Sequence, residues 1–383
     1  MIVTELRFVL LVVACWATFF ALPPPWRASV LAFWGLVFYT IYAATSVPLV
    51  VGLVVAVHLL SRPRLAWIAV VTVVGLLAYF KWNAAGADAA PATGTAAAVL
   101  IPLGFSFLAF ELIHVALDRG RGLAGGSLTD LAAFALFFPS RIAGPLKRLP
   151  DFTAAVARAE ASSENVYAGL CRILLGLVKK VVIADTLGLM VAEVGYAATP
   201  AHVWRVVLAY SLQIFFDFSA YSDVAVGVSR VLGIKVPENF QRPYLSPNIQ
   251  EFWNRWHITL STWVRGYVFL PLGHRLFRTG LRRHPLGIAA ASYLVSFVIV
   301  GAWHGLAPNY VVWGAYHGLL LTGYHAARTV LPPAVALGRL YTSRVATVAG
   351  TALTFGLVSI GWVPFMTDLP DAWRLLRIMF LLG

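Results

Sequence analysis

Residues 286–304 read LGIAAASYLVSFVIVGAWH, a run without Asp, Glu, Lys or Arg that ends in a histidine. A straight helix needs about 20 consecutive apolar residues to cross the hydrocarbon core of a bilayer, so this run is predicted to be a membrane span. Gly305 and Pro308 follow it and predict that the helix ends at His304. A histidine at the end of a span is usually structural, but a helix break here would leave the imidazole of His304 in a cavity, able to exchange protons.

The rest of the chain is apolar in the same way. Hydrophobic residues make up 60% of the 383 residues and charged residues 12%, whereas a soluble domain has about 25% charged residues. At about 20 residues per crossing, this composition sets an upper limit near eleven crossings. We therefore predict an all-α integral membrane protein, one polytopic domain over 1–383, with about ten or eleven transmembrane helices plus short re-entrant or interfacial helices. The first apolar run, at 6–22, is expected to be a retained span.

The positive charge of the chain lies between the apolar runs. Lys and Arg number 29 and Asp and Glu 16, which gives a net charge of +13. Residues 230–283 hold nine basic and two acidic residues. Because cytoplasmic loops of membrane proteins collect Lys and Arg, this segment is predicted to face the cytoplasm. Membrane topology thus accounts for the basic excess, so we expect the lipid bilayer as a partner and no nucleic acid.

The stretch from Ser211 to Asp223, SLQIFFDFSAYSD, carries polar side chains where a span should avoid them. Carboxylates at membrane depth are costly unless they face a cavity or a partner. Asp217 and Tyr221 are separated by four residues and therefore share a helix face. Two interpretations remain open. Either Asp217, Tyr221 and Asp223 line a buried chamber, or the carboxylates are structural and bind Arg or backbone groups.

A proline-flanked loop follows at 237–244, PENFQRPY. Prolines at both ends make it a break between helices. It is either a surface turn or a clamp for an anionic donor molecule, in which Arg242 supplies the charge and Asn239 lines the site.

The segment from Glu251 to Arg265, EFWNRWHITLSTWVR, is predicted to form one amphipathic helix. Its apolar arc contains three tryptophans, which suits either a helix lying on the membrane surface or an aromatic-lined pocket. Glu251 and Arg255 are expected to form an ion pair on the opposite face. His257 falls at the edge of the apolar arc, and Trp253 and Arg255 are further candidates for lining a site.

Four stretches together resemble the membrane-bound O-acyltransferase family, in its bacterial branch of alginate O-acetyltransferases and teichoic acid D-alanyltransferases. They are IPLGFSF at 101–107, FFPSRIAGPL at 137–146, the 61-residue block over 213–273, and GAWHG with WGAYHG over 301–318. The resemblance spans residues 100–318, which would form the core of the family fold. It implies transmembrane helices packed around a central funnel, and transfer of an acyl group to a hydroxyl.

The resemblance also implies the catalytic residues. The family's central histidine lies in a Trp-His-Gly motif, here Trp303, His304 and glycine. His257 lies 47 residues before His304 and is expected on the same pore, and Trp303 and His317 are further lining candidates. An imidazole that removes the proton of an attacking hydroxyl contributes about 10²–10⁴-fold in rate, so we assign His304 as general base. His257 would orient the substrate or polarise the thioester carbonyl, and an acyl-histidine intermediate is the alternative to direct transfer.

The donor is expected to be acetyl-CoA or another acyl thioester from the cytoplasm, attracted by the basic residues of 230–283. No permanently bound cofactor is expected, and the scattered histidines predict no metal site. The acceptor would be an extracytoplasmic polysaccharide, reached directly, through a carrier protein or through a periplasmic or extracellular acetyltransferase-like partner. The protein would be a multi-pass component of the bacterial cytoplasmic (inner) membrane.

Two other functions stay open on the sequence. The first is D-alanyl transfer to teichoic acid from a carrier protein. The second is a proton-coupled transporter or flippase, in which Asp217, Asp223 and the histidines form a proton relay.

Overall fold

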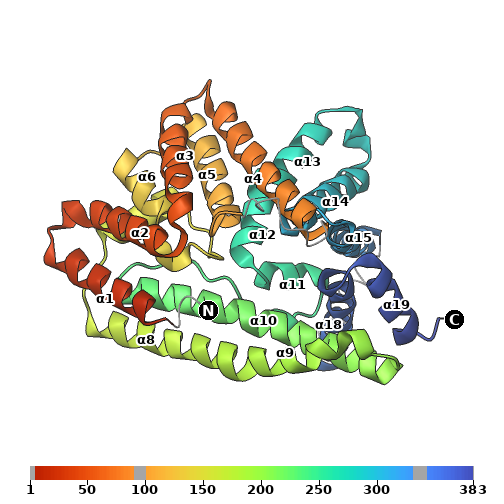
Figure 1. The fold of residues 1–383 in the computed structure, drawn as a ribbon. Coiled ribbons are helices and arrows are strands. Elements are labelled where there is room, and N and C mark those ends of the chain that lie inside the picture. The colour runs from red at the N-terminus through yellow and green to blue at the C-terminus, as the bar shows by residue number, and fades with distance from the viewer. Residues whose placement is uncertain (1–4, 90–100, 331–342, 383) are drawn as a thin grey trace. The chain divides into compact units, whose positions relative to one another are not determined.

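The structure is a computed structural model that describes residues 5–89, 101–330 and 343–382. All regular elements in these ranges are helices, and none of the described residues forms a strand (Figure 1). The predicted all-α class is therefore confirmed. The number of crossings, about ten or eleven, stays a prediction. Within the described ranges, four helical stretches are long and apolar enough to cross a membrane: Pro24–Leu60, Ala66–Ala85, Pro285–His304 and Arg344–Met366.

The chain divides into two compact units, each built from segments far apart in the sequence. The first unit consists of Met1–Lys179 and Ser219–Glu238. The predicted organisation, a single domain with a core at 100–318 and a basic segment at 230–283, stays a prediction. The helices of the first unit are α1 (Leu6–Ala21), α2 (Arg27–Ala43), α3 (Val47–Leu60), α4 (Ala66–Ala89), α5 (Phe105–Gly120), α6 (Leu128–Ala135), α7 (Leu149–Ala157), α8 (Ser163–Val178) and the second part of α10 (Pro200–Val231).

Two glycines bring α8 and α10 together in the first unit. A Cβ on Gly169 would lie 2.7 Å from the carbonyl oxygen of Gly227, and a Cβ on Gly227 would lie 2.7 Å from that of Gly169. In a membrane the hydrophobic effect does not drive helices together, because the lipid chains are as apolar as the side chains. Helices therefore associate through close packing at small residues such as these glycines.

The second unit consists of Lys180–Phe218 and Asn239–Gly383. One π-helix, Lys179–Ala184, leads from α8 into α9, and another, Arg265–Phe269, joins α12 to α13. The helices of this unit are α9 (Asp185–Val191), the first part of α10, α11 (Ile249–Arg255), α12 (Ile258–Val264), α13 (Leu270–Phe277), α14 (Pro285–His304), α15 (Pro308–Val330), α18 (Arg344–Met366) and α19 (Leu369–Met379).

α14 and α15 form a closely packed helical hairpin. α14 ends at His304, as the sequence predicted, and α15 begins at Pro308. A Cβ on Gly314 of α15 would lie 2.2 Å from the carbonyl oxygen of Phe297 of α14, so the helices touch backbone to backbone at this point. This contact fixes where the last turn of α14, with His304, lies relative to α15.

The predicted single helix over 251–265 is wrong. α11 and α12 are separated at His257, whose backbone adopts the left-handed conformation with φ of 44°. A non-glycine residue rarely adopts this conformation, so tertiary contacts hold the break. The burial of the segment's tryptophans favours the aromatic pocket over a helix lying on a membrane surface. The buried tryptophans are Trp253, Trp256 and Trp263.

Candidate active site

His257 lies at the junction of α11 and α12 with 3% of its surface exposed. Its Nδ1 is 3.0 Å from Oδ1 of Asn239. The same oxygen accepts hydrogen bonds from the hydroxyl of Thr259 at 2.9 Å and from the Thr259 backbone N–H at 3.4 Å. Because a backbone N–H can only donate, the Asn239 atom is assigned as oxygen, and Nδ1 of His257 carries the proton that it donates. The neutral ring therefore presents an unprotonated Nε2.

Backbone hydrogen bonds fasten the Asn239 loop to the helix break. The Ile258 N–H donates to the carbonyl of Asn239 at 2.9 Å. The Gln241 N–H donates to the carbonyl of Arg255 at 3.0 Å. The loop is thus hydrogen-bonded to the chain on both sides of His257, and these bonds stabilise the left-handed backbone conformation of His257.

The surroundings of His257 favour its neutral form. Phe218 packs edge-on against the ring at a centroid distance of 4.7 Å, and Phe240 stacks at 6.4 Å. His257 lies outside the four candidate spans, and burial lowers its pKa to about 3, with the charge of His304 as a second cause. At neutral pH the ring is therefore uncharged, and its Nε2 can act as a hydrogen-bond acceptor.

His304 closes α14 and is half-buried among aromatic rings. The charge of His304 contributes to the lowered pKa of His257. Ring contacts through Trp313 and Trp362 connect His304 to Trp256, the residue before His257. The structure thus brings into one unit the two histidines that the sequence assigned to catalysis, although the roles themselves stay predictions. The rings around His304 have centroid distances of 4.5 Å for Trp303, 4.9 Å for Phe365, 5.3 Å for Trp313 and 6.4 Å for Tyr310.

His317 is a third histidine of the same unit and is fully buried on α15. The rings of Trp253 and Trp313 each lie at a centroid distance of 5.1 Å. Neither ring nitrogen has a hydrogen-bond partner among the described residues. A buried polar group without a partner costs about 1–3 kcal/mol, so a water molecule or a substrate group would stabilise this ring.

A cavity of about 200 Å³ lies between α11, α12, α14 and α15. Gln250, Asn254 and Arg265 are exposed polar residues of its lining, and most of the other lining side chains are apolar. Two buried donors also line it, Nε1 of Trp253 and Oγ of Ser296, and neither has a partner in the part of the chain that is described. An apolar wall with a few polar groups is typical of a ligand pocket. Because Trp253 also contacts the His317 ring, this tryptophan belongs both to the cavity wall and to the surroundings of His317.

The two carboxylates of α10 have cationic partners. In the first unit, Asp223 is buried and binds Arg172 Nε and Lys179 Nζ, both at 2.5 Å. In the second unit, Asp217 is half-exposed and binds Lys180 Nζ at 2.6 Å. These ion pairs favour the structural interpretation of the carboxylates over a chamber wall or a proton relay.

The remaining candidates divide between the two units. Tyr221 belongs to the first unit, where its hydroxyl accepts a hydrogen bond from the Ile142 N–H at 3.1 Å. Arg255 forms the expected ion pair with Glu251 at 3.4 Å in the second unit. Arg242 is exposed in its loop. The roles of Arg242 and Arg255 toward a donor stay predictions, as does the absence of a metal; the described residues contain no group of three metal-binding side chains.

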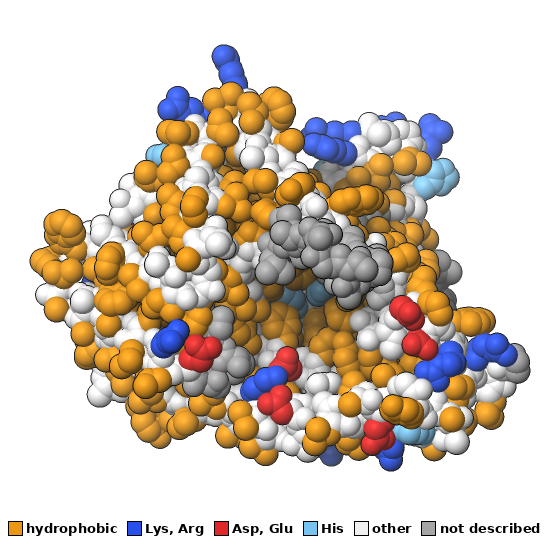
Figure 2. Space-filling model, in the orientation of Figure 1, with side chains coloured by type: hydrophobic (Ala, Val, Ile, Leu, Met, Phe, Trp, Pro, Cys, Tyr) orange, Lys and Arg blue, Asp and Glu red, His pale blue; other side chains and the backbone are white. Residues whose placement is uncertain are grey.

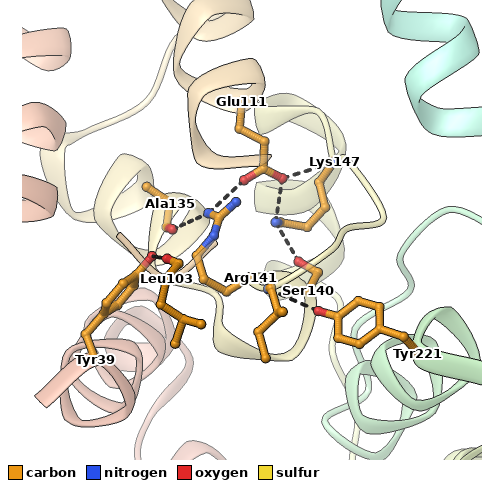
Figure 3. Close-up of polar contacts among 9 residues, drawn as sticks. Tyr39, Leu103, Glu111, Ala135, Ser140, Arg141, Lys147 and Tyr221 are labelled. Atoms are coloured by element: carbon orange, nitrogen blue, oxygen red, sulfur yellow. Dashed lines mark hydrogen bonds and ion pairs between the residues drawn. The ribbon is translucent and has the colours of Figure 1, made fainter. Parts of the chain in front are cut away.

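A buried ionic cluster in the first unit was not predicted (Figure 3). Glu111 of α5 binds Arg141 Nη1 at 3.0 Å and Lys147 Nζ at 2.7 Å, and all three side chains are at most 2% exposed. Lys147 also donates to Oγ of Ser140 at 2.8 Å. The cluster ties the loop that follows α6 to α5.

One signal in the sequence could have indicated this cluster. Glu111 interrupts an apolar run at 97–117, and a carboxylate at such a position requires a cationic partner. Arg141 lies within the stretch FFPSRIAGPL that carried the family resemblance. The spacing of 30 residues between Glu111 and Arg141 gives no periodicity from which the pair could be inferred.

The fold and the site together define a class: a helical membrane protein whose site is built from histidines that lie among aromatic rings, beside a largely apolar cavity. Residues 123–349 match the sequence pattern of the membrane-bound O-acyltransferase family. The chain belongs to this family. The expected enzyme class, an acyltransferase, is thereby confirmed at the level of the family.

Relatives of the chain carry three different names. It is 35% identical over 375 residues to the probable alginate O-acetylase AlgI of Pseudomonas aeruginosa, which covers 92% of this chain and 68% of the relative. It is 34% identical over 235 residues to the teichoic acid D-alanyltransferase of Bacillus subtilis, 58% of each protein. It is 34% identical over 259 residues to the peptidoglycan O-acetyltransferase of Helicobacter pylori, 65% of this chain and 46% of the relative. The chain spans about two thirds of the length of its alginate O-acetylase relatives, 62% and 68% for two of them.

Proposed function

We propose that this protein transfers an acyl group, in the simplest case acetyl, from a cytoplasmic thioester to hydroxyl groups of an extracytoplasmic polysaccharide, directly or through a partner protein. Family membership supports O-acyl transfer, and the relatives named for alginate and peptidoglycan support a polysaccharide acceptor. The observation that carries the proposal is the presence of His257 and His304 in one unit, where ring contacts through Trp313 and Trp362 connect His304 to Trp256, the neighbour of His257. The four candidate spans support a multi-pass protein of the bacterial inner membrane.

In the proposed reaction, His304 removes the proton of the acceptor hydroxyl while the hydroxyl oxygen attacks the thioester carbon. The new C–O bond forms, the C–S bond breaks, and the leaving thiolate takes up the proton that His304 received. General-base catalysis of this kind contributes about 10²–10⁴-fold in rate. Because His304 is half-buried at the end of α14, it keeps an open side toward a substrate.

His257 would orient the acceptor by accepting a hydrogen bond from a neighbouring hydroxyl of the sugar, because the proton of the attacking hydroxyl goes to His304. Its Nδ1–H is engaged by Asn239, so a neutral ring can accept a hydrogen bond at Nε2 but cannot donate one. Polarising the thioester carbonyl would need a donor at Nε2, hence a protonated ring, which burial disfavours. The geometry therefore supports orientation of the substrate over polarisation of the carbonyl.

The cavity beside α14 would receive the donor. A pantetheine arm alternates methylene and amide groups, which suits an apolar wall that also carries the two donors of Trp253 and Ser296. Arg265 is an exposed residue of the cavity lining, where it would attract the phosphates of acetyl-CoA, with Arg242 and Arg255 adding positive charge. No permanently bound cofactor enters this scheme.

The proposal is tested with the full-length protein in proteoliposomes, radiolabelled acetyl-CoA and O-deacetylated alginate as the acceptor. We expect label on the polysaccharide, at a rate at least about 100-fold lower for His304→Ala. His325→Ala removes an exposed histidine from α15 and serves as the matched control. Wild-type transfer by a His304→Ala protein with unchanged thermal stability would show that His304 is not the base.

D-Alanyl transfer is the second candidate, favoured by the similarity to the teichoic acid D-alanyltransferase of Bacillus subtilis. The same proteoliposomes separate the two reactions when they are offered a D-alanyl carrier-protein thioester in place of acetyl-CoA. Labelling of teichoic acid from this donor, without labelling from acetyl-CoA, would replace acetylation by D-alanylation as the function.

A further inference from the structure

A basic arm, residues 270–284, projects from the second unit just before α14. It consists of α13 and a short 3-10 helix, Gly280–Arg283. In Figure 2, basic side chains gather at the upper right, over the position of α13 in Figure 1. All the arginines of the arm are exposed: Arg275, Arg278, Arg282 and Arg283.

The arm itself carries four arginines and no acidic residue. The sequence contains no acidic residue between Glu251 and Asp368. Among the described residues, none of the four guanidinium groups of the arm forms an ion pair. The arm thus offers four uncompensated positive charges to an anionic partner.

Large apolar side chains alternate with these arginines. Phe277 is 60% exposed and Leu281 48% exposed. Pro285 follows the arm directly and begins α14, one of the four candidate spans. The arm therefore lies where hydrocarbon gives way to headgroups, the depth at which an amphipathic helix buries apolar side chains and meets lipid phosphates.

We propose that the arm binds the phosphate headgroups of anionic phospholipids and inserts Phe277 and Leu281 among their acyl chains. Charge complementarity and the position at the end of a span favour this partner. A nucleotide or an acidic protein would satisfy the arginines, but neither would require both apolar side chains to stand exposed beside them. The four arginines, Phe277 and Leu281 do not line the proposed donor cavity, so the inference does not depend on acyl transfer.

The test counts lipids bound to the full-length protein in detergent, by native mass spectrometry, during titration with phosphatidylglycerol or phosphatidylcholine. Each basic residue near an anionic surface is worth about 1 kcal/mol, roughly a fivefold factor in binding, so loss of all four charges should weaken phosphatidylglycerol binding at least about tenfold. Phosphatidylcholine binding should stay unchanged. The arm variant is Arg275→Gln, Arg278→Gln, Arg282→Gln and Arg283→Gln.

A control variant removes the same number of exposed charges elsewhere and should bind phosphatidylglycerol as the wild type does. A second test variant, Phe277→Ser with Leu281→Ser, keeps the arm's charge and should weaken binding of both lipids. The proposal is overturned if the arm and control variants bind phosphatidylglycerol equally, or if the arm variant loses acetyl-CoA affinity while its lipid binding is unchanged. The control substitutions are Arg121→Gln, Arg158→Gln, Lys235→Gln and Arg377→Gln, at exposed residues that do not adjoin a candidate span.

Discussion

Replacing Asn239 by Asp is expected to move the acid limb of the acyl-transfer pH profile to higher pH. In the wild type, burial lowers the pKa of His257 to about 3, so the ring is neutral over pH 5–9. An Asp carboxylate in place of the amide would face Nδ1, which lies 3.0 Å from the present oxygen. Opposite charges about 4 Å apart gain roughly 4 kcal/mol at an effective dielectric constant of 20, equivalent to about three pKa units.

The Asn239→Asp variant would therefore protonate His257 near pH 6. Below this pH the Nε2 atom carries a proton and can no longer accept a hydrogen bond, so activity should be lost as the pH falls through the raised pKa. The assay is kcat/KM for acetyl transfer over pH 5–9. Asn165→Asp makes the same chemical change at the N-terminus of α8 and should leave the profile unchanged. Identical profiles for wild type and Asn239→Asp would refute the role of Asn239 in setting the state of His257.

The companion variant Asn239→Leu removes the acceptor without adding charge. It leaves the buried donors of His257 and Thr259 without this oxygen, at a cost of about 1–3 kcal/mol in unfolding free energy. It also releases the His257 tautomer from a hydrogen bond worth about 1 kcal/mol, so kcat should fall by roughly fivefold or more. Thermal denaturation in detergent and single-turnover transfer measure the two effects separately.

Three further perturbations have expected outcomes. Gly361→Ala places a Cβ 2.8 Å from Nε2 of His317 and should lower the free energy of unfolding by about 1–3 kcal/mol. Gly356→Ala, whose Cβ would have no atom within 4 Å, should not lower it by this overpacking. Lys147→Met removes one of the two cations that bind the buried carboxylate of Glu111 and should lower the free energy of unfolding by about 3–5 kcal/mol. Lys235→Met, at an exposed lysine, should cause no comparable loss. Equal melting temperatures of the two variants would contradict this account. Folding lowers the pKa of His257, so the unfolded chain takes up a proton on this residue at a higher pH than the folded chain does, and the free energy of unfolding falls as the pH drops below about 6.5. His257→Gln should reduce this pH dependence by up to about 1.4 kcal/mol per pH unit. An unchanged pH dependence would argue against a buried neutral ring.

The sequence predicted those features of the fold that depend on neighbouring residues, such as helix ends and ion pairs within a helix. α14 ends at His304 because Gly305 and Pro308 cannot continue it, and both residues are visible in the sequence. The Glu251–Arg255 ion pair follows from helical spacing alone. The predicted apolar arc of 251–265 supplies tryptophans to the interior because burial follows hydrophobicity even where the helix breaks.

The break at His257 was not predictable from its neighbours. No glycine or proline marks it, and the apolar periodicity of the segment runs through it without interruption. The bonds that hold it come from the Asn239 loop, about 18 residues earlier, so only the folded structure shows them. The Glu111 cluster escaped prediction for the same reason, because its ion pairs join residues 30 and 36 positions apart.

For the carboxylates of α10, the sequence left two interpretations open, and the ion pairs in the structure favour one of them. A carboxylate in an apolar helix signals either a functional chamber or a hidden partner. Arg172 and Lys179, which bind Asp223, lie in α8 and in the π-helical turn after it, some 50 residues earlier in the chain. Family membership and histidine geometry, rather than these carboxylates, support the proposed function.

The central claim, that His304 drives acylation of an envelope polysaccharide, is tested most directly by mass spectrometry of that polysaccharide. The polysaccharide is compared between cells that lack the gene and the same cells complemented with wild type, His304→Ala or His325→Ala at equal membrane levels. We predict that O-acyl groups are lost on deletion, return with wild type and with His325→Ala, and stay absent with His304→Ala. Full restoration of O-acylation by His304→Ala would contradict the claim.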